Sequence, residues 1–291
     1  MFSYEQAFER NLGWVRESEQ QVLRSKRVAI AGLGGVGGAH LLALTRLGIG
    51  RFTLADFDHF ELHNFNRQVG ANIGSLGRPK IDVMAEMALA INPELDLVRF
   101  DKGVDHVNAE AFLDGADLYI DGLDFFVLDE RQRIFELCAE RGIPAITVAP
   151  LGMGAALLVF LPGEMTFEQY FRMGSTSPAE KAARFLVGLS PSMLQMGYLV
   201  DPSRVDLAAG KGPSTPIACE LCAGIAATEA LKVLLGRGRV RAAPWGLHFD
   251  AYKNRLKRTW RPGGNAHPLQ RALIALTRRR YAAEMPEPAD S

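Results

Sequence analysis

The stretch from Arg27 to Asp58 constrains the fold of this chain more than any other part of the sequence. Two short apolar runs, Val28 to Ala31 and Phe52 to Ala55, predict buried parallel strands. Between them lie a cluster of glycines and an apolar helix pattern from Ala39 to Leu47. Strand, glycine turn, helix and strand in this order form the βαβ unit of nucleotide-binding sheets. The stretch therefore predicts an α/β fold with a phosphate site at the turn.

The glycines of this turn are suited to binding phosphate groups. Backbone N–H groups can approach a phosphate closely where no side chain intervenes, and the helix N-terminus adds partial positive charge. Asp56 follows the second strand, where a carboxylate can accept hydrogen bonds from ribose hydroxyls. A glycine turn alone also closes ordinary strand–helix corners, but here both flanking elements and the acid are present. The glycines concerned are Gly32, Gly34, Gly35, Gly37 and Gly38.

A polar loop and a lysine-led helix follow this unit. Residues 59–77 have no clear period, are rich in Asn and Gly, and include Asn64, Asn66, Arg67 and Gln68. An amphipathic helix is expected from about Lys80 to Ile91. A lysine at a helix N-terminus meets the positive end of the dipole, and an anion bound between them would resolve the conflict. Taken alone, a lysine or arginine such as Lys80 or Arg67 is more often a solvated surface residue.

Two acids follow the next predicted central strand, Asp117 to Ile120. Asp121 and Asp124 would lie at the carboxyl end of this strand, where doubly wound sheets bind ligands. A carboxylate beside phosphates suits Mg²⁺, which prefers oxygen ligands. The alternative is that one of the two acids caps the helix expected to run to about Arg141. Both roles can hold together.

The remaining patterns complete the architecture. We predict a Rossmann-like doubly wound, mostly parallel sheet with an added antiparallel C-terminal part. Residues 1–262 would form one domain, in which 163–216 hold short helices and a mobile crossover loop over the nucleotide site, and 263–291 would form a C-terminal helix and tail. The other expected elements are strands at 96–101, 145–149 and 156–161, helices at 108–113, 217–235 and 268–283, and a strand pair within 245–260.

Composition and charge exclude several function classes. Lys plus Arg equals Asp plus Glu, at 33 each, so no global field favours nucleic acid or an anionic membrane. No apolar run of about 18 residues predicts a membrane span, and the N-terminus lacks the layout of a signal peptide. We therefore expect a cytoplasmic protein. A local phosphate-binding patch stays open, formed by Arg255, Lys257, Arg258, Arg261 and 278–280.

The cysteines and histidines give no metal pattern. Cys219 and Cys222 form a CxxC pair, which is half of a tetrahedral zinc site, and Cys138 belongs to a different predicted helix. Because the pair lies on a strongly apolar helix, core packing is the favoured interpretation, and no structural zinc is expected. The six histidines are scattered through the sequence.

Together these motifs resemble the ThiF/MoeB/HesA family, which has the adenylating fold of ubiquitin-activating enzymes. The resemblance covers roughly residues 8–162 and 217–260. The motifs that carry it are GLGGVG from Gly32, DFD from Asp56, NFNRQ from Asn64, GRPK ending at Lys80, INP from Ile91, DGLD ending at Asp124 and TEALKVLLG from Thr228.

The resemblance implies a role for each of these positions. The glycine turn with Asp56 and Asp58 would bind ATP, and Asp124 would bind Mg²⁺. A substrate carboxylate would attack the α-phosphate, giving an acyl-adenylate and pyrophosphate. Arg10 is similar to the N-terminal arginine that reaches into the partner subunit of a homodimer in this family. The residues that would contact the phosphates are Asn64, Arg67 and Lys80.

The sequence departs from the family pattern in three places. The zinc cysteines are incomplete, residues 163–216 contain no cysteine for a thioester, and Asp124 is followed by FFVLDER. These departures favour plain adenylation, as in the tRNA threonylcarbamoyladenosine dehydratase branch or in natural-product and peptide-modifying members. The carboxylate could belong to a ubiquitin-like or peptide C-terminus, a small acid or a modified tRNA base.

Two other function classes compete with adenylation. A nicotinamide-dependent oxidoreductase would use the same βαβ unit, but it gives no reason for Arg67 and Lys80 to follow the acid. A non-catalytic relative would bind nucleotide and a protein partner without turnover. The presence of Arg67, Lys80 and Asp124 argues against that alternative.

Overall fold

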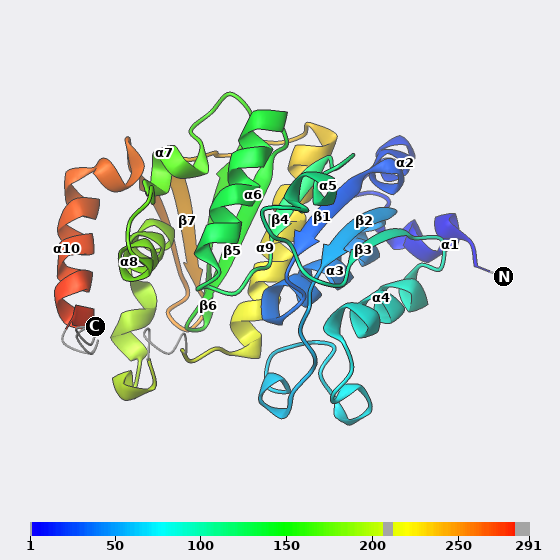
Figure 1. Cartoon of the computed structure of the whole chain (residues 1–291). Coiled ribbons are helices and arrows are strands. Elements are labelled where there is room, and N and C mark those ends of the chain that lie inside the picture. The colour runs from blue at the N-terminus through cyan, green and yellow to red at the C-terminus, as the bar shows by residue number, and fades with distance from the viewer. Residues whose placement is uncertain (1, 206–211, 283–291) are drawn as a thin grey trace.

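The computed structural model describes residues 2–205 and 212–282. Apolar runs buried on both faces form the central strands, and the strands from this part of the chain make one sheet (Figure 1). The strands are β1 Arg27–Ala31, β2 Arg51–Ala55, β3 Asp96–Phe100, β4 Leu118–Asp121, β5 Ala145–Leu151, β6 Gly154–Phe160, β7 Trp245–Asp250 and β8 Arg255–Trp260.

The order of the strands in the sheet is β3-β2-β1-β4-β5-β6-β7-β8. β1 to β5 pair in parallel, whereas β6, β7 and β8 add antiparallel neighbours at one side. The predicted mostly parallel, doubly wound sheet with an antiparallel C-terminal part is therefore confirmed. Since the strand order reverses between β1 and β4, the carboxyl ends of these two strands form the switch point at which such sheets bind ligands.

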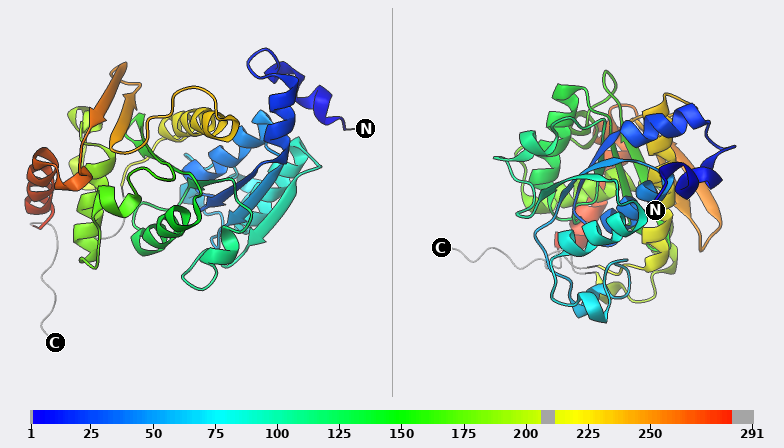
Figure 2. Two further views of the ribbon diagram at one scale, coloured as in Figure 1. Left: turned by 90° about the horizontal axis from the view of Figure 1, so that it is seen from above. Right: turned by 90° about the vertical axis from the view of Figure 1, so that its right-hand side faces the viewer.

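Helices cover both faces of the sheet, and Figure 2 shows α9 on one side and α6 on the other. None of the helices in 2–205 and 212–282 combines the length and apolarity needed to cross a bilayer. The first face carries α3 Gly35–Leu47, α4 Lys80–Ile91 and α9 Pro216–Leu235. The second face carries α5 Ala109–Phe112, α6 Leu128–Arg141, α7 Phe167–Phe171 and α8 Pro178–Leu189. The outer helices are α1 Tyr4–Phe8, α2 Glu17–Ser25 and α10 Pro268–Ala282.

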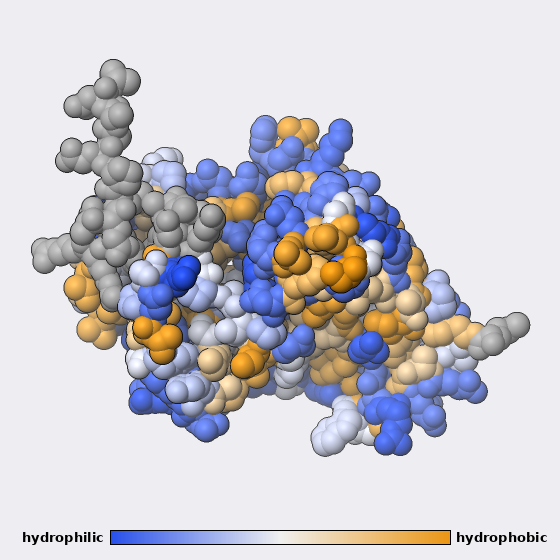
Figure 3. Space-filling view, turned by 90° about the horizontal axis from the view of Figure 1, so that it is seen from below, coloured by the Kyte–Doolittle hydropathy of each residue, from blue (hydrophilic) through white to orange (hydrophobic). Residues whose placement is uncertain are grey.

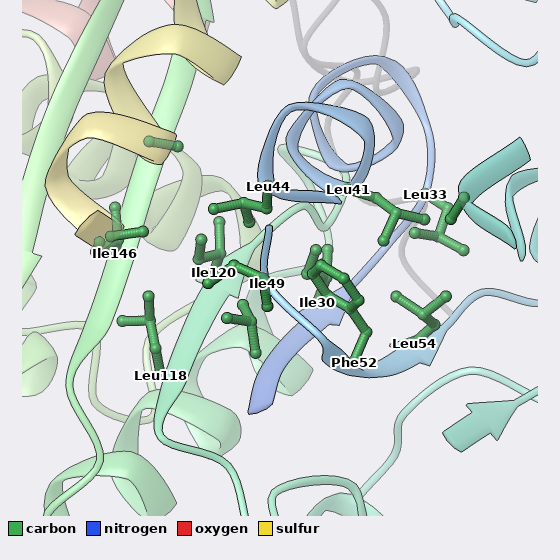
Figure 4. Packing of buried hydrophobic residues seen from close by; sticks show 14 of the residues in the cluster. Ile30, Leu33, Leu41, Leu44, Ile49, Phe52, Leu54, Leu118, Ile120 and Ile146 are labelled. Carbon is green, nitrogen blue, oxygen red and sulfur yellow. The ribbon is translucent and has the colours of Figure 1, made fainter. Parts of the chain in front are cut away.

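The sheet has one hydrophobic core on each of its faces, and successive side chains of β1 alternate between them. Val28 and Ile30 enter the core beneath α3, while Ala29 and Ala31 enter the core beneath α5 and α6. Figure 4 shows Ile30 and Phe52 of the sheet packed beneath Leu41 and Leu44 of α3. All four of these large side chains are fully buried. Burying one such side chain stabilises the fold by about 1.5–3 kcal/mol, so α3 and the glycine turn are held firmly on the sheet.

The segment predicted as short helices and a mobile loop contains α7, α8 and two short 3₁₀ helices, η4 Leu194–Tyr198 and η5 Pro202–Arg204. Phe167, Phe171 and Phe185 bury their rings in the core on the second face. This part of the segment is thus built into the domain. Residues 206–211 lie outside the described residues, and mobility over the nucleotide site stays a prediction. The expected helix end at Ala283 and the tail also lie outside them.

His40 is a buried histidine in α3, just after the glycine turn. It is fully enclosed, and neither ring nitrogen has a hydrogen-bond partner among the described residues. Burial lowers the pKa of the imidazole from 6.5 to about 3. The folded protein therefore keeps His40 neutral at pH values at which the unfolded chain protonates it.

We predict that His40→Leu flattens the acid side of the stability profile. The pKa in the fold lies below its value of 6.5 in the unfolded chain, so the contribution of His40 is complete above pH 6.5 and is lost as the pH falls toward 3. Urea unfolding should show that wild type loses about 2 kcal/mol more than the variant between roughly pH 7 and pH 5. The exposed His106→Leu serves as the control; equal losses in wild type and His40→Leu would contradict the assignment.

Candidate active site

The glycine loop, residues 32–38, packs directly against the end of β4. Gly32 has φ +83°, and a Cβ added there would lie 2.3 Å from the carbonyl oxygen of Gly122. A Cβ on Gly37 would lie 1.8 Å from the carbonyl oxygen of Gly32. Real Cβ atoms do not approach so closely, and the positive φ also favours glycine. Glycine at these positions therefore lets β1, the start of α3 and the end of β4 meet at the switch point.

The glycine loop leaves backbone donors free at the start of α3. The first bond of the helix is donated by Gly38 N–H to the Gly34 carbonyl oxygen at 3.2 Å. The N–H groups of Gly35, Val36 and Gly37 have no backbone acceptor among the described residues. A helix N-terminus with free N–H groups and its positive dipole end is an anion-binding arrangement. The geometry fits the phosphates of a nucleotide.

Asp56 fixes the glycine loop from the end of β2. Its Oδ2 accepts a hydrogen bond from Leu33 N–H at 2.6 Å, and its Oδ1 accepts one from Asp58 N–H at 2.8 Å. Burial raises the pKa of the Asp56 carboxyl, and these two hydrogen bonds and Lys80 oppose that shift. Asp56 thus holds the glycine loop in place through its side chain. Its contact with a ribose stays a prediction.

Lys80 is the first residue of α4, and only 6% of its surface is exposed. Its Nζ lies 2.9 Å from Oδ2 of Asp58, whose carboxylate is half-exposed. The conflict with the helix dipole expected from the sequence is therefore relieved within the protein by Asp58. Since Asp58 N–H binds Asp56, a continuous set of contacts connects Lys80 to the glycine loop.

The loop between β2 and α4 brings three more polar residues to this place. Arg67 lies beside the glycine loop, with its Cγ 3.6 Å from where a Cβ on Gly35 would be. Its Nη1 donates to the His63 carbonyl oxygen at 3.1 Å. Asn64 is buried, and its Oδ1 accepts from Glu61 N–H at 2.9 Å, closing the 3₁₀ helix η2 Leu62–Asn64. The side-chain oxygen of Asn64 therefore stabilises the loop. A contact between Asn64 and a phosphate stays a prediction.

Gln68 is a site residue that sequence reasoning did not select. It is buried, and its Oε1 has no hydrogen-bond partner within the described residues. Its Nε2 lies 3.6 Å from the position of a Cβ on Gly34. A buried oxygen without a hydrogen bond raises the free energy of the folded state, so this position favours a ligand that donates a hydrogen bond to it. The sequence signals for it were its place in the polar cluster with Asn64, Asn66 and Arg67 and at the end of the NFNRQ motif, but no role followed from either.

A buried ion pair supports the loop that carries Asp124. Asp121 and Arg131 are almost fully enclosed, and Oδ2 of Asp121 lies 2.8 Å from Arg131 Nε and 2.9 Å from Thr147 Oγ1. The guanidinium of Arg131 also donates to the carbonyl oxygens of Leu123 at 2.8 Å and Asp124 at 3.0 Å. Arg131 therefore holds the backbone of the DGLD turn from beneath.

The alternative in which Asp121 or Asp124 caps the next helix is wrong. α6 begins at Leu128 with Val127 at the cap position, and no side chain caps it. The Asp121 carboxylate forms an ion pair with Arg131. Oδ1 of Asp124 accepts a hydrogen bond from Phe126 N–H at 3.1 Å in a local turn. The FFV sequence delays the start of α6, which leaves the Asp124 side chain exposed. Its Oδ2 has no hydrogen-bond partner in the described parts of the chain.

The cysteines are buried thiols, as expected. Cys222 lies in the core beneath α3, and Cys138 is enclosed in α6. Cys219 places its Sγ 3.0 Å from the position of a Cβ on Gly35, so the start of α9 abuts the glycine loop. Burial raises the pKa of the Cys219 thiol. The described residues hold no group of three or more His, Cys, Asp or Glu suited to a metal ion; the absence of zinc stays a prediction.

Arg10 is the predicted site residue that the chain does not bring to the others. It is exposed in the 3₁₀ helix η1 Glu9–Asn11. Asn11 Nδ2 donates to the Leu47 carbonyl oxygen at 3.3 Å, which ties this segment to the far end of α3. A helix of 13 residues is about 20 Å long. Arg10 therefore lies well away from the glycine loop of its own chain.

Comparisons with known proteins agree on one family. The model of the ThiF family matches residues 8–271. A tRNA threonylcarbamoyladenosine dehydratase of Bacillus subtilis is 34% identical over 150 residues, which cover 51% of this chain and 57% of that relative. The sulfur carrier protein ThiS adenylyltransferase of Escherichia coli is 33% identical over 146 residues, 50% of this chain and 58% of the relative. The chain thus spans little more than half the length of either relative.

A solved structure extends the likeness of fold over most of the chain. The selenomethionine form of PaaA superposes with a TM-score of 0.66 and covers 89% of this chain and 76% of its own. Its sequence identity is 18%, so this likeness concerns the fold.

We predict that Arg131→Met destabilises the protein by about 3–5 kcal/mol, because it leaves the Asp121 carboxylate buried without its partner. Urea denaturation gives the free energy of unfolding. The matched control is Arg133→Met on the same helix, whose side chain is 37% exposed, and it should cost less than about 1 kcal/mol. Similar losses in both variants would show that the buried pair does not support the turn.

Proposed function

The chain belongs to the ThiF family, and on this premise we propose that it is an ATP- and Mg²⁺-dependent adenylyltransferase. It activates a carboxylate of its substrate as an acyl-adenylate. A carboxylate oxygen bonds to the α-phosphorus of ATP, the bond from that phosphorus to the bridging oxygen breaks, and pyrophosphate leaves. Negative charge accumulates on the phosphate oxygens during this transfer, so fixed donors and cations lower its barrier.

One observation carries the proposal: a helix N-terminus with N–H groups unpaired in the described parts of the chain has one cation beside it and a second cation linked to it through two carboxylates. Arg67 lies beside Gly35, and Lys80 is connected to the same loop through Asp58 and Asp56. The N–H groups of the glycine loop would bind the phosphates, while Arg67 and Lys80 would offset the charge at the α-phosphate. A hydride-transfer site would instead need an apolar slot for a nicotinamide ring.

The residues present also fit a magnesium ion. Mg²⁺ is bound by one or two carboxylates together with substrate phosphates. Asp124 supplies an exposed carboxylate on the turn that packs against the glycine loop through Gly122. When bound there, Mg²⁺ would neutralise part of the phosphate charge. The ion pair of Asp121 and Arg131 would hold the turn in position.

The absence of cysteine from residues 163–216 supports direct use of the adenylate without a thioester in that segment. A second candidate function is an activity similar to that of tRNA threonylcarbamoyladenosine dehydratase. The Bacillus subtilis relative of that name supports it. The exposed side chains of Arg255, Lys257 and Arg258 on β8 add a surface to which tRNA phosphates could bind.

We infer a cytoplasmic homodimer in which the subunits complete each other's sites. Arg10 lies at the wrong end of α3 to act in its own chain, so its role requires a partner. Next to the site, the loop between β2 and α4 exposes Leu62 and Leu76, with Ile73 of the 3₁₀ helix η3 Ile73–Ser75 between them in sequence. Figure 3 shows hydrophobic side chains gathered on the face where this loop lies. A second copy of the chain would cover them.

We predict that Lys80→Ala and Asp124→Ala each slow ATP–pyrophosphate exchange by at least about 100-fold, the scale for losing one preorganised charge. Exchange is measured with a panel of carboxylates, and the products are identified as AMP and pyrophosphate. Lys102→Ala and Asp114→Ala remove exposed charges of the same kind and should leave the rate unchanged. Near-normal exchange in either site variant would remove its role, and ADP with phosphate as products would overturn the reaction class.

We also predict that mixing Arg10→Ala and Lys80→Ala chains restores activity that neither variant has alone. In a mixed dimer one of the two sites has both its own Lys80 and the partner's Arg10. A random mixture should therefore recover on the order of a quarter of wild-type exchange. Native mass spectrometry checks that mixed dimers form. If they form and remain inactive, the sites are not shared.

A further inference from the structure

We propose that a second anion site, separate from the glycine loop, binds the phosphate groups of a ligand carrying two or more negative charges. It is a cavity of about 580 Å³ formed by residues of α7–α8 and of the C-terminal part around α10. Figures 1 and 2 place α10 at one edge of the molecule, whereas α3 lies near the middle of the sheet. The polar side chains that line the cavity are Arg172, Glu180, Arg184, Asn265, Arg271 and Arg278.

The charge within this cavity is strongly unbalanced. Four guanidinium groups and one carboxylate line it, which leaves three positive charges uncompensated. Glu180 binds Arg184 Nε at 2.7 Å and lies 3.0 Å from Arg278 Nε. Arg172 and Arg271 form no ion pair within the described part of the chain. Like charges gathered in a concave site repel one another, and a bound anion relieves that repulsion.

The wall of the cavity is held by buried hydrogen bonds. Asn265 Nδ2 donates to the carbonyl oxygens of Phe171 at 2.8 Å and Arg184 at 3.0 Å. Gln270 Nε2 donates to the Val187 carbonyl oxygen at 3.2 Å. The bonds of Asn265 fix the turn before α10 on α7 and α8, and the bond of Gln270 fixes the start of α10 on α8. The arginines therefore project from elements that keep their spacing when no ligand is bound, which is the condition for preorganised binding.

The backbone at Arg172 supports a binding role. Arg172 directly follows α7 and has φ +54°, a conformation in which glycine is the usual residue. Its carbonyl oxygen accepts a hydrogen bond from Arg184 Nη1. The chain thus keeps a long cationic side chain at the cavity in a backbone position that costs roughly 1–2 kcal/mol for any residue but glycine. Retained strain of this kind is typical of functional sites.

The arginines favour phosphate over a simple carboxylate. A guanidinium presents paired N–H donors that match phosphate oxygens. A monocarboxylate brings one negative charge and would leave two of the three positive charges uncompensated. A phosphate monoester, pyrophosphate or neighbouring phosphates of an RNA strand bring two or more. The shared chemistry is therefore the phosphate group, from a free phosphate compound or from RNA.

Calorimetric titration of pyrophosphate, with the glycine loop saturated by a non-hydrolysable ATP analogue, tests this proposal. We expect one additional binding event that Arg172→Ala and Arg271→Ala each weaken at least about tenfold. Glu180→Gln should tighten it severalfold, because it removes the competing negative charge and frees Arg184 and Arg278; a purely structural Glu180 would give weaker binding. Arg133→Ala on α6 is the control and should bind as wild type does.

A second arm replaces pyrophosphate with a labelled RNA of about 12 nucleotides and measures fluorescence anisotropy. Dependence on Arg172 and Arg271 in either arm supports the site, and the arm in which it occurs identifies the source of the phosphates. Absence of saturable binding in both arms, or equal weakening by Arg133→Ala, overturns the proposal. ATP–pyrophosphate exchange should be unchanged in these variants, so a failure here is separate from a failure of the proposed adenylation.

Discussion

The close contact of three backbone segments at the switch point is the constraint on which the rest of the site depends. Gly32 and Gly37 lie against each other and against Gly122, with no room for a side chain on any of them. This contact sets how near the start of α3 comes to the turn after β4. It thereby brings the start of α3 close to the turn on which Asp124 lies. The parts of the candidate site that we propose to bind phosphate and Mg²⁺ therefore depend on the same backbone contact.

The charges around this contact are arranged in two layers. Asp121 and Arg131 neutralise each other inside the protein and hold the backbone that carries Asp124. Lys80 and Asp58 pair nearer the surface, where the Asp58 carboxylate is half-exposed. Buried ion pairs contribute little net stability, but they fix geometry because neither partner has an alternative. The pair of Asp121 and Arg131 therefore holds the backbone in position. The pair of Lys80 and Asp58 instead keeps a cation at a place where a bound anion could replace the Asp58 carboxylate.

The sheet could be predicted from the sequence because buried parallel strands leave continuous apolar runs such as Val28 to Ala31. The positions of Asp56 and Lys80 at element ends followed from the same patterns. The partner of Lys80 did not, since Asp58 lies 22 residues away and only the fold brings them together. Arg131 was missed because its burial is invisible in a polar helix sequence. The capping alternative failed for a related reason, because the sequence does not show that the Asp121 carboxylate pairs with Arg131 inside α6.

The contact between the start of α9 and the glycine loop has a consequence for how the protein is made. Cys219 lies against Gly35, although most of the chain is synthesised between them. The ribosome releases β1 and α3 long before α9 exists, so the apolar surface of α3 that α9 later covers is open to solvent in the nascent chain. Such surfaces favour aggregation and slow the completion of a fold rich in distant contacts. A truncated chain that ends before α9 would keep the glycine motif and yet lack a finished nucleotide site.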